Sequence, residues 1–454
     1  MKRFAVLVFK GLGWLALTLA TIALAWLAFN NRWVDAAQQP VPEPLRMAPA
    51  TVPAQRNIFF ALIGINDADP MAAGQAQWAD LQQGGKDEAN PTVWGISAPW
   101  ACGPKTENCV EHWTGQADAV GAQLQADAAR GERCAALAAP DLDFEELTPE
   151  PSAGLAANAH ISPHTVSAGR CVRWLLASAV VAAHRGRDDD SLRRLLQADR
   201  LLRLQLAGSR TLISHAVAWS AARLQWQTVA TLFARHPGWA ARHSEPLGAL
   251  LRPLPPQALS AARWIAIQSG FERKVLAALI PGNCMASLPD GASSADAGAW
   301  VCMMDKSYMP QATQREFDQR WLGVLAQSEL NARQSPLSPR FTQPAAEGMW
   351  QWRNTVGHIM FFVAQGQWIG YARKQADVEL FRQTAFLAVW LAAQLPAART
   401  TWLNSQPIDA ALRKRIHLSD DNTQLLARSW QDAPDVPDFR IPLAPLRDQH
   451  HAAP

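Results

Sequence analysis

One pair of histidines in the chain has the spacing of zinc ligands. His160 and His164 lie four residues apart, with Pro163 between them. The proline places the pair on a turn rather than on one face of a helix, and no third ligand follows at a zinc-like spacing. We therefore expect two exposed loop histidines, and we expect no metal ion and no cofactor.

A second group of candidate ligands lies in an acidic run. Asp141, Asp143 and Glu145 alternate like the first ligands of a calcium-binding EF-hand loop. Glu146 and Ser152 stand where that loop requires glycine and glutamate, so the motif is incomplete. The run predicts an acidic surface loop that holds a cation loosely at most.

Motifs for covalent catalysis and for phosphate binding are missing from the sequence. The chain has no Gly-x-Ser-x-Gly elbow, and the run at residues 84–86 lacks the other residues of a phosphate-binding loop. A glycosidase needs two carboxyl groups that face each other. The only candidates for such a pair are Glu145 or Glu146 together with Glu347. Catalytic residues therefore stay unknown from the sequence.

Tryptophan is unusually frequent, since the chain has 20 Trp and only two Tyr. A bias toward GC-rich codons explains much of this ratio, and core packing absorbs most large aromatic side chains. One cluster could nevertheless line a groove for a peptide or a sugar, since flat aromatic faces bind both. The candidate binding residues in this cluster are Trp350, Trp352, His358, Trp368 and Tyr371.

The six cysteines indicate an oxidising compartment, because their number is even and no Cys-x-x-Cys motif occurs. We interpret them as structural disulfides rather than as zinc ligands. Six cysteines allow 15 pairings. The pairing that the spacing favours is Cys102 with Cys109, Cys284 with Cys302 and, as the remaining pair, Cys134 with Cys171.

The first secondary-structure element that the sequence predicts is a membrane-spanning helix. Residues 11–29 contain no charge, and a helix of this length, at about 1.5 Å per residue, covers most of the roughly 30 Å hydrocarbon core. Lys2, Arg3 and Lys10 precede the run, which favours a cytoplasmic tail at residues 1–10 by the positive-inside rule. We expect a signal anchor of a single-pass inner-membrane protein with the bulk of the chain in the periplasm.

The alternative to an anchor is a cleaved signal peptide. The best small-x-small cleavage site, at residues 34–36, lies far downstream of the apolar run. In both cases the rest of the chain is exported.

Composition divides the exported part into four segments. Residues 30–56 are a Pro-rich, stiff spacer, and residues 57–169 are an acidic, Cys-containing segment. Residues 170–440 form a helical domain, and residues 441–454 form a flexible tail. We expect the acidic segment to be irregular and held by disulfides, with helices only near residues 56–65 and 117–137.

From residue 170 onward the pattern predicts a mainly α fold built from helical hairpins, with strands nearly undetectable. Gly186 is a suitable C-terminal cap of the first helix, and the aspartates at 188–190 are suitable N-terminal residues of the second. The expected helices are 171–185, 191–207, 211–235, 239–251, 257–280, 312–333, 347–366, 375–395, 407–416 and 421–430.

Three phrases of the sequence resemble a known kind of protein. They are residues 57–74 (NIFFALIGINDADPMAAG), 201–216 (LLRLQLAGSRTLISHA) and 353–371 (RNTVGHIMFFVAQGQWIGY). They resemble segments of uncharacterised, single-span, membrane-anchored helical proteins of Gram-negative bacteria. The resemblance implies an anchor followed by an exported helical domain. It brings no established activity and no site residue.

The formal net charge of +3 hides a split. Residues 58–169 hold four basic and 15 acidic residues, a net charge of −11, and the remainder holds 38 basic and 24 acidic residues, a net charge of +14. We expect the acidic segment to dock on the basic helical domain, held there by the Cys134–Cys171 disulfide. No Lys/Arg-rich block or nucleic-acid-binding module occurs, so we expect no nucleic-acid partner.

The favoured interpretation is a membrane-anchored periplasmic helical protein that acts as a non-catalytic binding or scaffold component of the cell envelope, because helical stacks offer extended surfaces to partners. Its expected partners are the inner membrane, through the N-terminal helix, and another envelope protein. Two alternatives stay open: an envelope hydrolase or carbohydrate-acting enzyme whose site follows no motif, and an immunity protein against an envelope-directed toxin. The sequence does not decide whether the protein is an enzyme.

Overall fold

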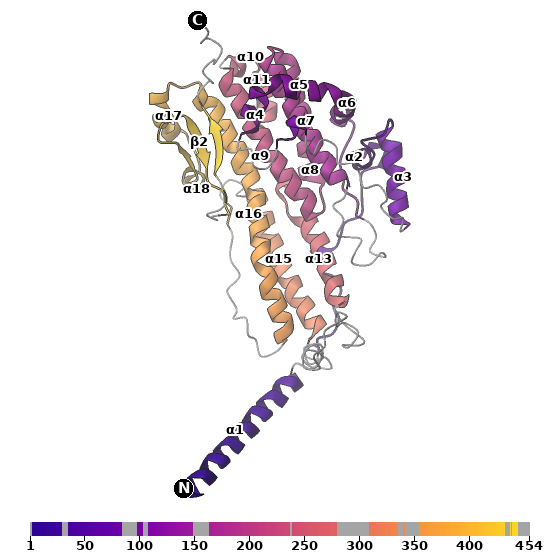
Figure 1. The fold of residues 1–454 in the computed structure, drawn as a ribbon, viewed down its shortest axis with the longest axis vertical. Coiled ribbons are helices and arrows are strands. Elements are labelled where there is room, and N and C mark those ends of the chain that lie inside the picture. The colour runs from indigo at the N-terminus through magenta and orange to yellow at the C-terminus, as the bar shows by residue number, and fades with distance from the viewer. Residues whose placement is uncertain are drawn as a thin grey trace. The chain divides into compact units, whose positions relative to one another are not determined.

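The computed structural model describes residues 2–29, 35–83, 98–102, 108–148, 163–236, 238–278, 308–334, 339–340, 354–431, 436 and 438–443, with all of their side chains except those of 2–13, 29, 275–278 and 355–368. This part of the chain is mainly helical, as the sequence predicts (Figure 1). The chain groups into two compact units. Unit 1 comprises residues 1–47, 265–326 and 342–370, and unit 2 comprises residues 48–264, 327–341 and 371–454.

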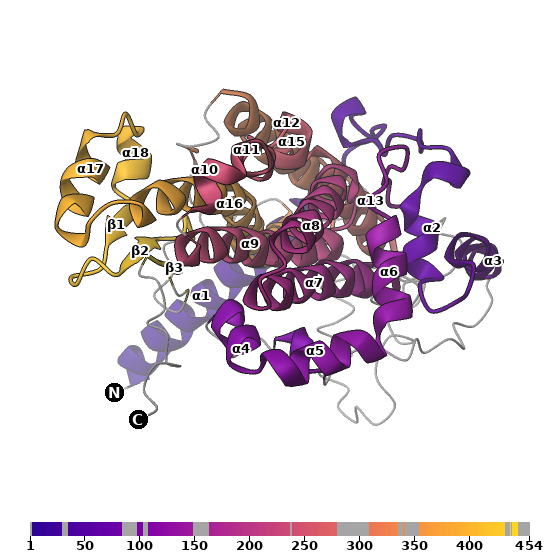
Figure 2. The same ribbon diagram turned by 90° about the horizontal axis from the view of Figure 1, so that it is seen from above.

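The centre of unit 2 is a group of three long helices, each of which contacts the other two (Figure 2). Gly186 takes a left-handed φ of 71° after the first helix, and the Arg187 amide donates to Ala182 at 2.9 Å, which closes the turn as the sequence predicts. The three aspartates that follow lie inside the first turn of the second helix, where carboxylates favour a helix N-terminus. The helices are α7 (Pro163–His184), α8 (Asp188–Gly208) and α9 (Leu212–Arg235).

The acidic segment is more helical in its described part than the sequence predicts. Three of its helices begin at capping side chains, because Asn57, Asp69 and Asn108 each accept a hydrogen bond from a backbone amide of the first turn. These caps are local signals of a helix start. The elements of the segment are α2 (Ile58–Ile63), α3 (Pro70–Gln82), η4 (Pro99–Ala101), α4 (Cys109–Gly115), α5 (Ala117–Ala126) and α6 (Ala128–Ala136), and η3 (Ala54–Arg56) precedes them at the end of the spacer.

The acidic segment docks on the basic helices within unit 2, as predicted from the charge split. Helices α4, α5 and α6 contact α7, and the Cys134–Cys171 disulfide joins α6 to α7. Arg194 of α8 pairs with Glu132 of α6, and the Arg200 guanidinium donates to three backbone carbonyls of residues 139–142. Docking therefore combines a covalent link, several ion pairs and bonds from arginine to peptide groups.

The C-terminal part of unit 2 contains a small antiparallel sheet where the sequence predicts helices. The predictions of helices at 407–416 and 421–430 are wrong, apart from the single turn of α18 (Ala410–Arg413). The strands are β1 (Ile416–Leu418), β2 (Gln424–Ala427) and β3 (Phe439–Pro442), in the order β1-β2-β3. They are too short to give a clear alternating pattern, although the turn-forming residues 419–423 between β1 and β2 are typical of a hairpin connection.

Short helices complete the described part of unit 2. After α9 come α10 (Trp239–Arg242), α11 (Ser244–Leu250), α12 (Pro256–Leu259) and the first residues of α13 (Ala262–Ala278). Further elements are the ends of α15 (Pro310–Gln334) and α16 (Thr355–Ala392), then η6 (Pro396–Ala398) and α17 (Arg399–Ser405). The helix α16 is one continuous helix of 38 residues, where the sequence predicts two.

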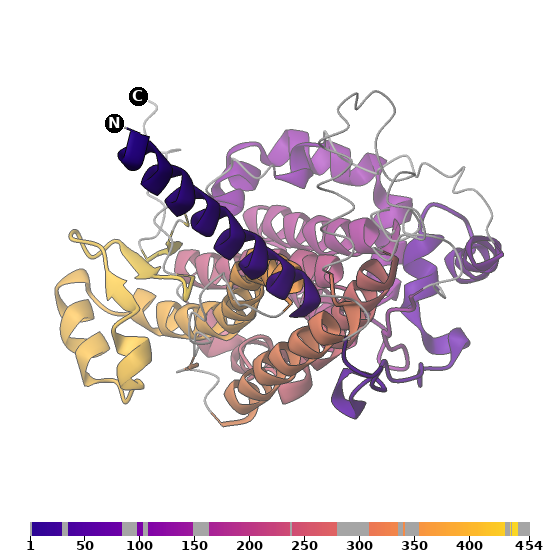
Figure 3. The same ribbon diagram turned by 90° about the horizontal axis from the view of Figure 1, so that it is seen from below.

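Unit 1 contains the N-terminal helix and parts of three others. Helix α1 (Lys2–Phe29) is one unbroken helix of 28 residues, drawn in indigo in Figure 3, and η2 (Glu43–Leu45) follows it. The Asp35 carboxylate accepts the backbone amides of Gln311 and Ala312 at 2.8 and 2.9 Å, so it caps the first turn of α15. This cap ties the chain just after α1 to the helices of unit 1.

Two apolar helices bear on the predicted membrane anchor. Among the described residues, α7 is the one helix long and apolar enough to cross a membrane, and it is mostly buried in the core. The apolar stretch Trp14–Ala28 of α1 is shorter but exposed, with Trp14 at 70% and Leu24 at 67% exposure. The burial of α7 is typical of a core helix, and the exposure of α1 leaves it as the candidate anchor.

The end of the Pro-rich spacer is fastened to unit 2. The backbone amides of Thr51 and Val52 donate to the Glu145 carboxylate at 2.6 and 2.8 Å, and the carbonyls of Ala48 and Pro49 accept from the Arg210 side chain at 2.8 and 3.2 Å. Residues 48–56, which the sequence assigns to a free spacer, thus belong to the folded unit.

Candidate functional site

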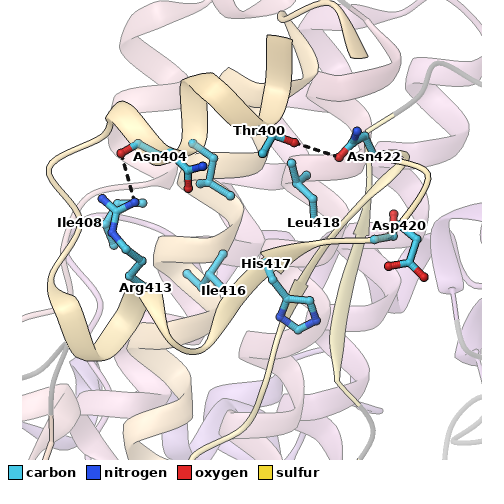
Figure 4. A pocket seen from close by; sticks show the side chains of 11 residues that line it. Thr400, Asn404, Ile408, Arg413, Ile416, His417, Leu418, Asp420 and Asn422 are labelled. Carbon is cyan, nitrogen blue, oxygen red and sulfur yellow. Dashed lines mark hydrogen bonds between the residues drawn. The ribbon is translucent and has the colours of Figure 1, made fainter. Parts of the chain in front are cut away.

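The best candidate site is a pocket at the C-terminal end of unit 2, with a cavity volume of about 510 Å³ (Figure 4). This volume falls in the range of small-ligand and peptide-side-chain pockets. Figure 4 shows Asn404, Ile408 and Arg413 on one side, Asp420 and Asn422 on the other, and β1 between them. Its lining residues are Thr400, Leu403, Asn404, Ile408, Arg413, Ile416, His417, Leu418, Ser419, Asp420 and Asn422.

The far wall of the pocket is built around Arg413. The residue ends α18, whose N-terminus is capped by Asp409. The Arg413 guanidinium donates to the backbone carbonyls of Asn404 and Gln406 at 3.2 and 2.6 Å. These bonds fix the loop between α17 and α18 at a distance from β1, and the space between loop and strand is the pocket.

The near wall is the turn between β1 and β2. Asn422 takes a left-handed φ of 57°, which asparagine tolerates, and its side-chain oxygen accepts from the Thr400 hydroxyl at 3.3 Å. The buried Arg399 donates to the carbonyls of Asn422 and Leu443 at 2.7 and 2.9 Å. The turn is therefore fastened to α17 by two side chains.

The polar residues of the pocket do not form a catalytic group. The Ser419 hydroxyl donates to Asp421 at 2.6 Å rather than to His417. Hydrogen bonds from Ser419 and then from Thr423 lower the pKa of the exposed Asp421 to about 2, so this side chain stabilises the turn as a carboxylate. A serine nucleophile needs a base of suitable pKa within hydrogen-bond reach, and the lowered pKa of Asp421 makes it a weak base for Ser419. The arrangement suits binding.

A second cavity, of about 440 Å³, lies over α8. Its Arg193 pairs with Asp190 at 2.6 Å, and its Arg200 donates to backbone carbonyls. Both arginines are thus engaged within the chain, as Arg413 is in the first pocket.

The predicted aromatic cluster is only partly visible. Trp350 and Trp352 lie outside the described residues, and His358 and Trp368 lie on α16 in the stretch whose side chains are not described. Tyr371 is half-buried in unit 2, with its ring 6.4 Å from that of Trp264 and the Lys374 ammonium 5.4 Å from its centre. The groove proposed for these residues stays a prediction.

Both disulfides expected among the described cysteines are formed. They join Cys102 to Cys109 and Cys134 to Cys171. The third expected pair, Cys284 with Cys302, lies outside the described residues. The described His, Cys, Asp and Glu side chains form no group of three that could hold a metal ion.

The acidic run that resembled an EF-hand ends in a buried polar cluster, so the expectation of an exposed loop is wrong for Glu145 and Glu146, which are 2% and 1% exposed. Glu146 accepts from the backbone amides of Arg210 and Thr211 at 2.5 and 2.8 Å and from the Ser214 hydroxyl at 2.7 Å. It thus caps the start of α9 as an anion at a helix N-terminus.

His164 completes this cluster, and the expectation that it lies on an exposed loop is also wrong. It is 2% exposed in the first turn of α7, with Nε2 3.0 Å from the Glu146 carboxylate. Burial raises the pKa of Glu146, but the hydrogen bond and charge of His164 and the bond from Ser214 outweigh it and hold that pKa at about 2. The zinc partner proposed for it, His160, lies outside the described residues.

The cluster contains serine, histidine and glutamate, yet its geometry is not that of a catalytic triad. A triad histidine contacts serine and carboxylate through different ring nitrogens. Here the Nε2 atom of His164 faces both the Glu146 carboxylate, at 3.0 Å, and the Ser214 hydroxyl, at 3.4 Å. Ser214 also donates directly to Glu146, and all three side chains are buried. The cluster is a structural clamp between the acidic segment, α7 and α9.

Glu145 extends the clamp to the spacer. Its carboxylate pairs with the buried Arg210 and accepts two amides of the spacer, and these bonds lower its pKa against the effect of burial. Glu347, the other candidate carboxylate, lies outside the described residues. A carboxylate whose lone pairs are taken by an arginine and backbone amides is not available as a nucleophile or an acid.

Sequence reasoning missed the pocket because we read its strands as helices. The signal was available: Ile416–Leu418 and Gln424–Ala427 flank the turn-rich run Ser-Asp-Asp-Asn-Thr, which is typical of a hairpin connection.

No family model, curated protein or solved structure matches the chain.

Proposed function

We propose that the chain is a single-pass protein of the inner membrane whose folded part lies in the periplasm and binds another component of the cell envelope. The observation that carries the proposal is the contrast between its two apolar helices. Helix α1 exposes the large apolar side chains of Trp14, Leu17 and Leu24, whereas α7 buries most of its surface. An exposed apolar helix, in a chain that buries its other apolar helix, needs an apolar environment of its own.

The disulfides support the proposal that the folded part lies on the periplasmic side of the membrane. Both join pairs of cysteines that are almost fully buried, and disulfides persist in exported rather than cytoplasmic compartments. Lys2, Arg3 and Lys10, which precede the uncharged run of α1, favour the same orientation, with the N-terminus in the cytoplasm.

A binding role is supported by the pocket beside β1, which has space and exposed polar groups and whose serine donates to a carboxylate that is a weak base. The hydrolase and the immunity protein gain no observation of their own from the described residues, so we do not propose them.

Fractionation of cells that make the full-length protein tests the proposal. We expect the protein to resist extraction from membranes by alkaline carbonate and its C-terminal part to be digested by protease in spheroplasts but not in intact cells. The double variant Leu19→Arg, Ile22→Arg places two charges in α1 and should shift the protein to the soluble fraction. The matched control Glu43→Arg, Arg46→Glu leaves α1 unchanged and should stay in the membrane.

Chemical cross-linking in the same intact cells tests the binding role. We expect one discrete adduct with an envelope protein, identified by mass spectrometry. Recovery of the monomer alone, where other envelope complexes are captured, would contradict the binding role. Carbonate-soluble wild-type protein would contradict the anchor.

A further inference from the structure

The two edges of the small sheet in unit 2 differ in how their backbone groups are used. In an antiparallel sheet, alternate residues of an edge strand turn their amide and carbonyl away from the neighbouring strand. The Arg428 amide donates to Arg415 at 2.9 Å and the Ser419 amide donates to Gln424 at 3.0 Å. These bonds place residues 415, 417 and 419 in the ladder with β2, so the backbone groups of Ile416 and Leu418 face outward.

The edge formed by β3 is covered. The Leu443 amide donates to Thr423 at 2.7 Å, so the outward-facing residues on this side are Asp438, Arg440 and Pro442, of which proline has no amide to offer. Asp438 and Arg440 are bonded to α9. Their carbonyls accept from the side chains of Arg223 and Gln227 of α9, both at 3.1 Å. Folded proteins protect sheet edges in this way against pairing with other chains.

The edge formed by β1 is not covered in the part of the chain that the structure describes. No hydrogen bond reaches the outward amides or carbonyls of Ile416 and Leu418 from another described residue. The pocket of about 510 Å³ lies along this edge, and both residues line it. The open space is therefore beside unpaired backbone donors and acceptors, which is the arrangement that accepts an additional strand.

Side chains around the pocket define what kind of strand fits. Leu403, Ile408 and Ile416 give it an apolar side, and an extended peptide would place every second side chain there. The intervening side chains would face the end of α18, where Arg413 and Lys414 are exposed. A peptide that carries an acidic residue next to its apolar residue would complement the positive charge of these two side chains.

We propose that β1 binds an extended peptide segment of an envelope protein by strand addition, with an apolar residue in the pocket and an acidic residue next to it. The peptide would exchange backbone hydrogen bonds with Ile416 and Leu418 and pack against Leu403. This inference rests on the proposed binding function and names the class of partner for it.

The test uses the full-length protein in detergent micelles and a display library of random eight-residue peptides. We expect the enriched peptides to share an apolar residue beside an acidic one. Peptides synthesised from the enriched set are then N-methylated at alternate residues, which removes the amide donors on one edge of the strand at a time. One methylated series should bind at least about tenfold more weakly and the other within about threefold of the parent, because only one edge contacts β1.

Two variants locate the peptide on β1. Leu418→Pro removes one outward amide without removing a ladder bond to β2, and proline is tolerated on an edge strand. We expect it to weaken binding at least about tenfold. Arg413→Glu should also weaken binding of the acidic peptides, whereas Arg440→Glu, the same change on the covered strand, should not.

Several results would overturn the proposal. The proposal fails if the library yields no enriched peptide, if both N-methylated series bind equally well, or if Leu418→Pro leaves peptide binding unchanged. A dimer of the protein that Leu418→Pro dissociates would identify a second copy of the chain as the occupant instead. If peptides bind as expected but cross-linking in cells finds no envelope partner, the proposed function fails while this edge remains a peptide site. If cross-linking finds a partner but no peptide binds β1, only this inference fails.

Discussion

The cluster around Glu146 and the pocket beside β1 are both rich in polar groups, but they use them in opposite ways. In the cluster, Glu146, His164 and Ser214 are buried and hydrogen-bonded to one another. In the pocket, no described residue bonds the outward backbone groups of Ile416 and Leu418, which line the cavity. The comparison shows that the residue types of a catalytic site mark a function only when they leave room and bonding capacity for a ligand.

The largest effect is expected from breaking the cluster. Glu146→Ala leaves the amides of Arg210 and Thr211 and the Ser214 hydroxyl without their acceptor, and loss of one partner of a buried ionic group costs about 3–5 kcal/mol of unfolding free energy. Thermal and urea unfolding of the full-length protein measure this loss. The control Glu132→Ala removes a largely exposed carboxylate and should cost less than about 1 kcal/mol. Equal losses for both variants would refute the clamp.

The disulfide that holds the acidic segment on α7 gives the next effect. Cys134 and Cys171 are 37 residues apart, and the loop-entropy model assigns such a link about 4 kcal/mol. The pair Cys102 and Cys109 is seven residues apart, for which the same model gives about 2.5 kcal/mol. Double alanine variants of each pair, compared by thermal unfolding, should follow this order. The reverse order would mean that the acidic segment stays docked without its covalent link.

A pH effect is expected from His215, which lies next to the cluster on α9. Burial lowers the pKa of His215 to about 4, against the opposing charge of Glu146. The unfolded chain takes up this proton near pH 6.5 and the folded chain near pH 4, so stability falls by up to about 3 kcal/mol as the pH drops between these values. His215→Gln should flatten this part of the stability profile, and the exposed His417→Gln should not. A profile that His215→Gln leaves unchanged would contradict the burial of a neutral histidine.

Below that range, the profile should report on Glu146. Its folded pKa of about 2 lies below the ordinary value of 4.5, so the stability that it contributes is present above pH 4.5 and is lost as the pH falls toward 2. In Glu146→Ala this acid-side decline should be smaller. An unchanged decline would assign it to other carboxyl groups.

The smallest effect on stability is expected at the pocket. Arg413 is exposed, and its guanidinium contacts only backbone carbonyls among the described residues, so Arg413→Glu should change the free energy of unfolding by no more than about 1 kcal/mol while it weakens peptide binding. Amide hydrogen exchange sharpens the comparison further. The outward amide of Leu418 should exchange much faster than that of Leu425, which lies in the ladder with β3. Equal protection would mean that β1 is already covered.

Local signals in the sequence predicted local features well. Gly186 ends α7 because only a left-handed residue closes that turn, and glycine adopts this conformation without strain. The Cys102–Cys109 pair followed from spacing alone. Both features depend on residues within one turn or one short loop.

Features that depend on distant residues could not be predicted in this way. His164 is buried because Glu146 and Ser214, 18 and 50 residues away in the chain, receive its imidazole. The pocket combines α17 with β1, and although the turn-rich run 419–423 is typical of a hairpin, nothing near it in the sequence indicates that α17 lies opposite. A pattern in the sequence records which side chains share a face, but not which distant segment lies opposite.

The most direct test of the central claim compares the two sheet edges in living cells. A photo-reactive p-benzoylphenylalanine is placed at His417, beside the open edge of β1, or at Arg440, on the covered strand β3. Both side chains are exposed on the same face of the sheet. We predict that light yields a discrete adduct with one envelope protein from position 417, that Leu418→Pro abolishes it, and that position 440 yields none. Equal adducts from both positions, or an adduct from position 440 alone, would contradict the account.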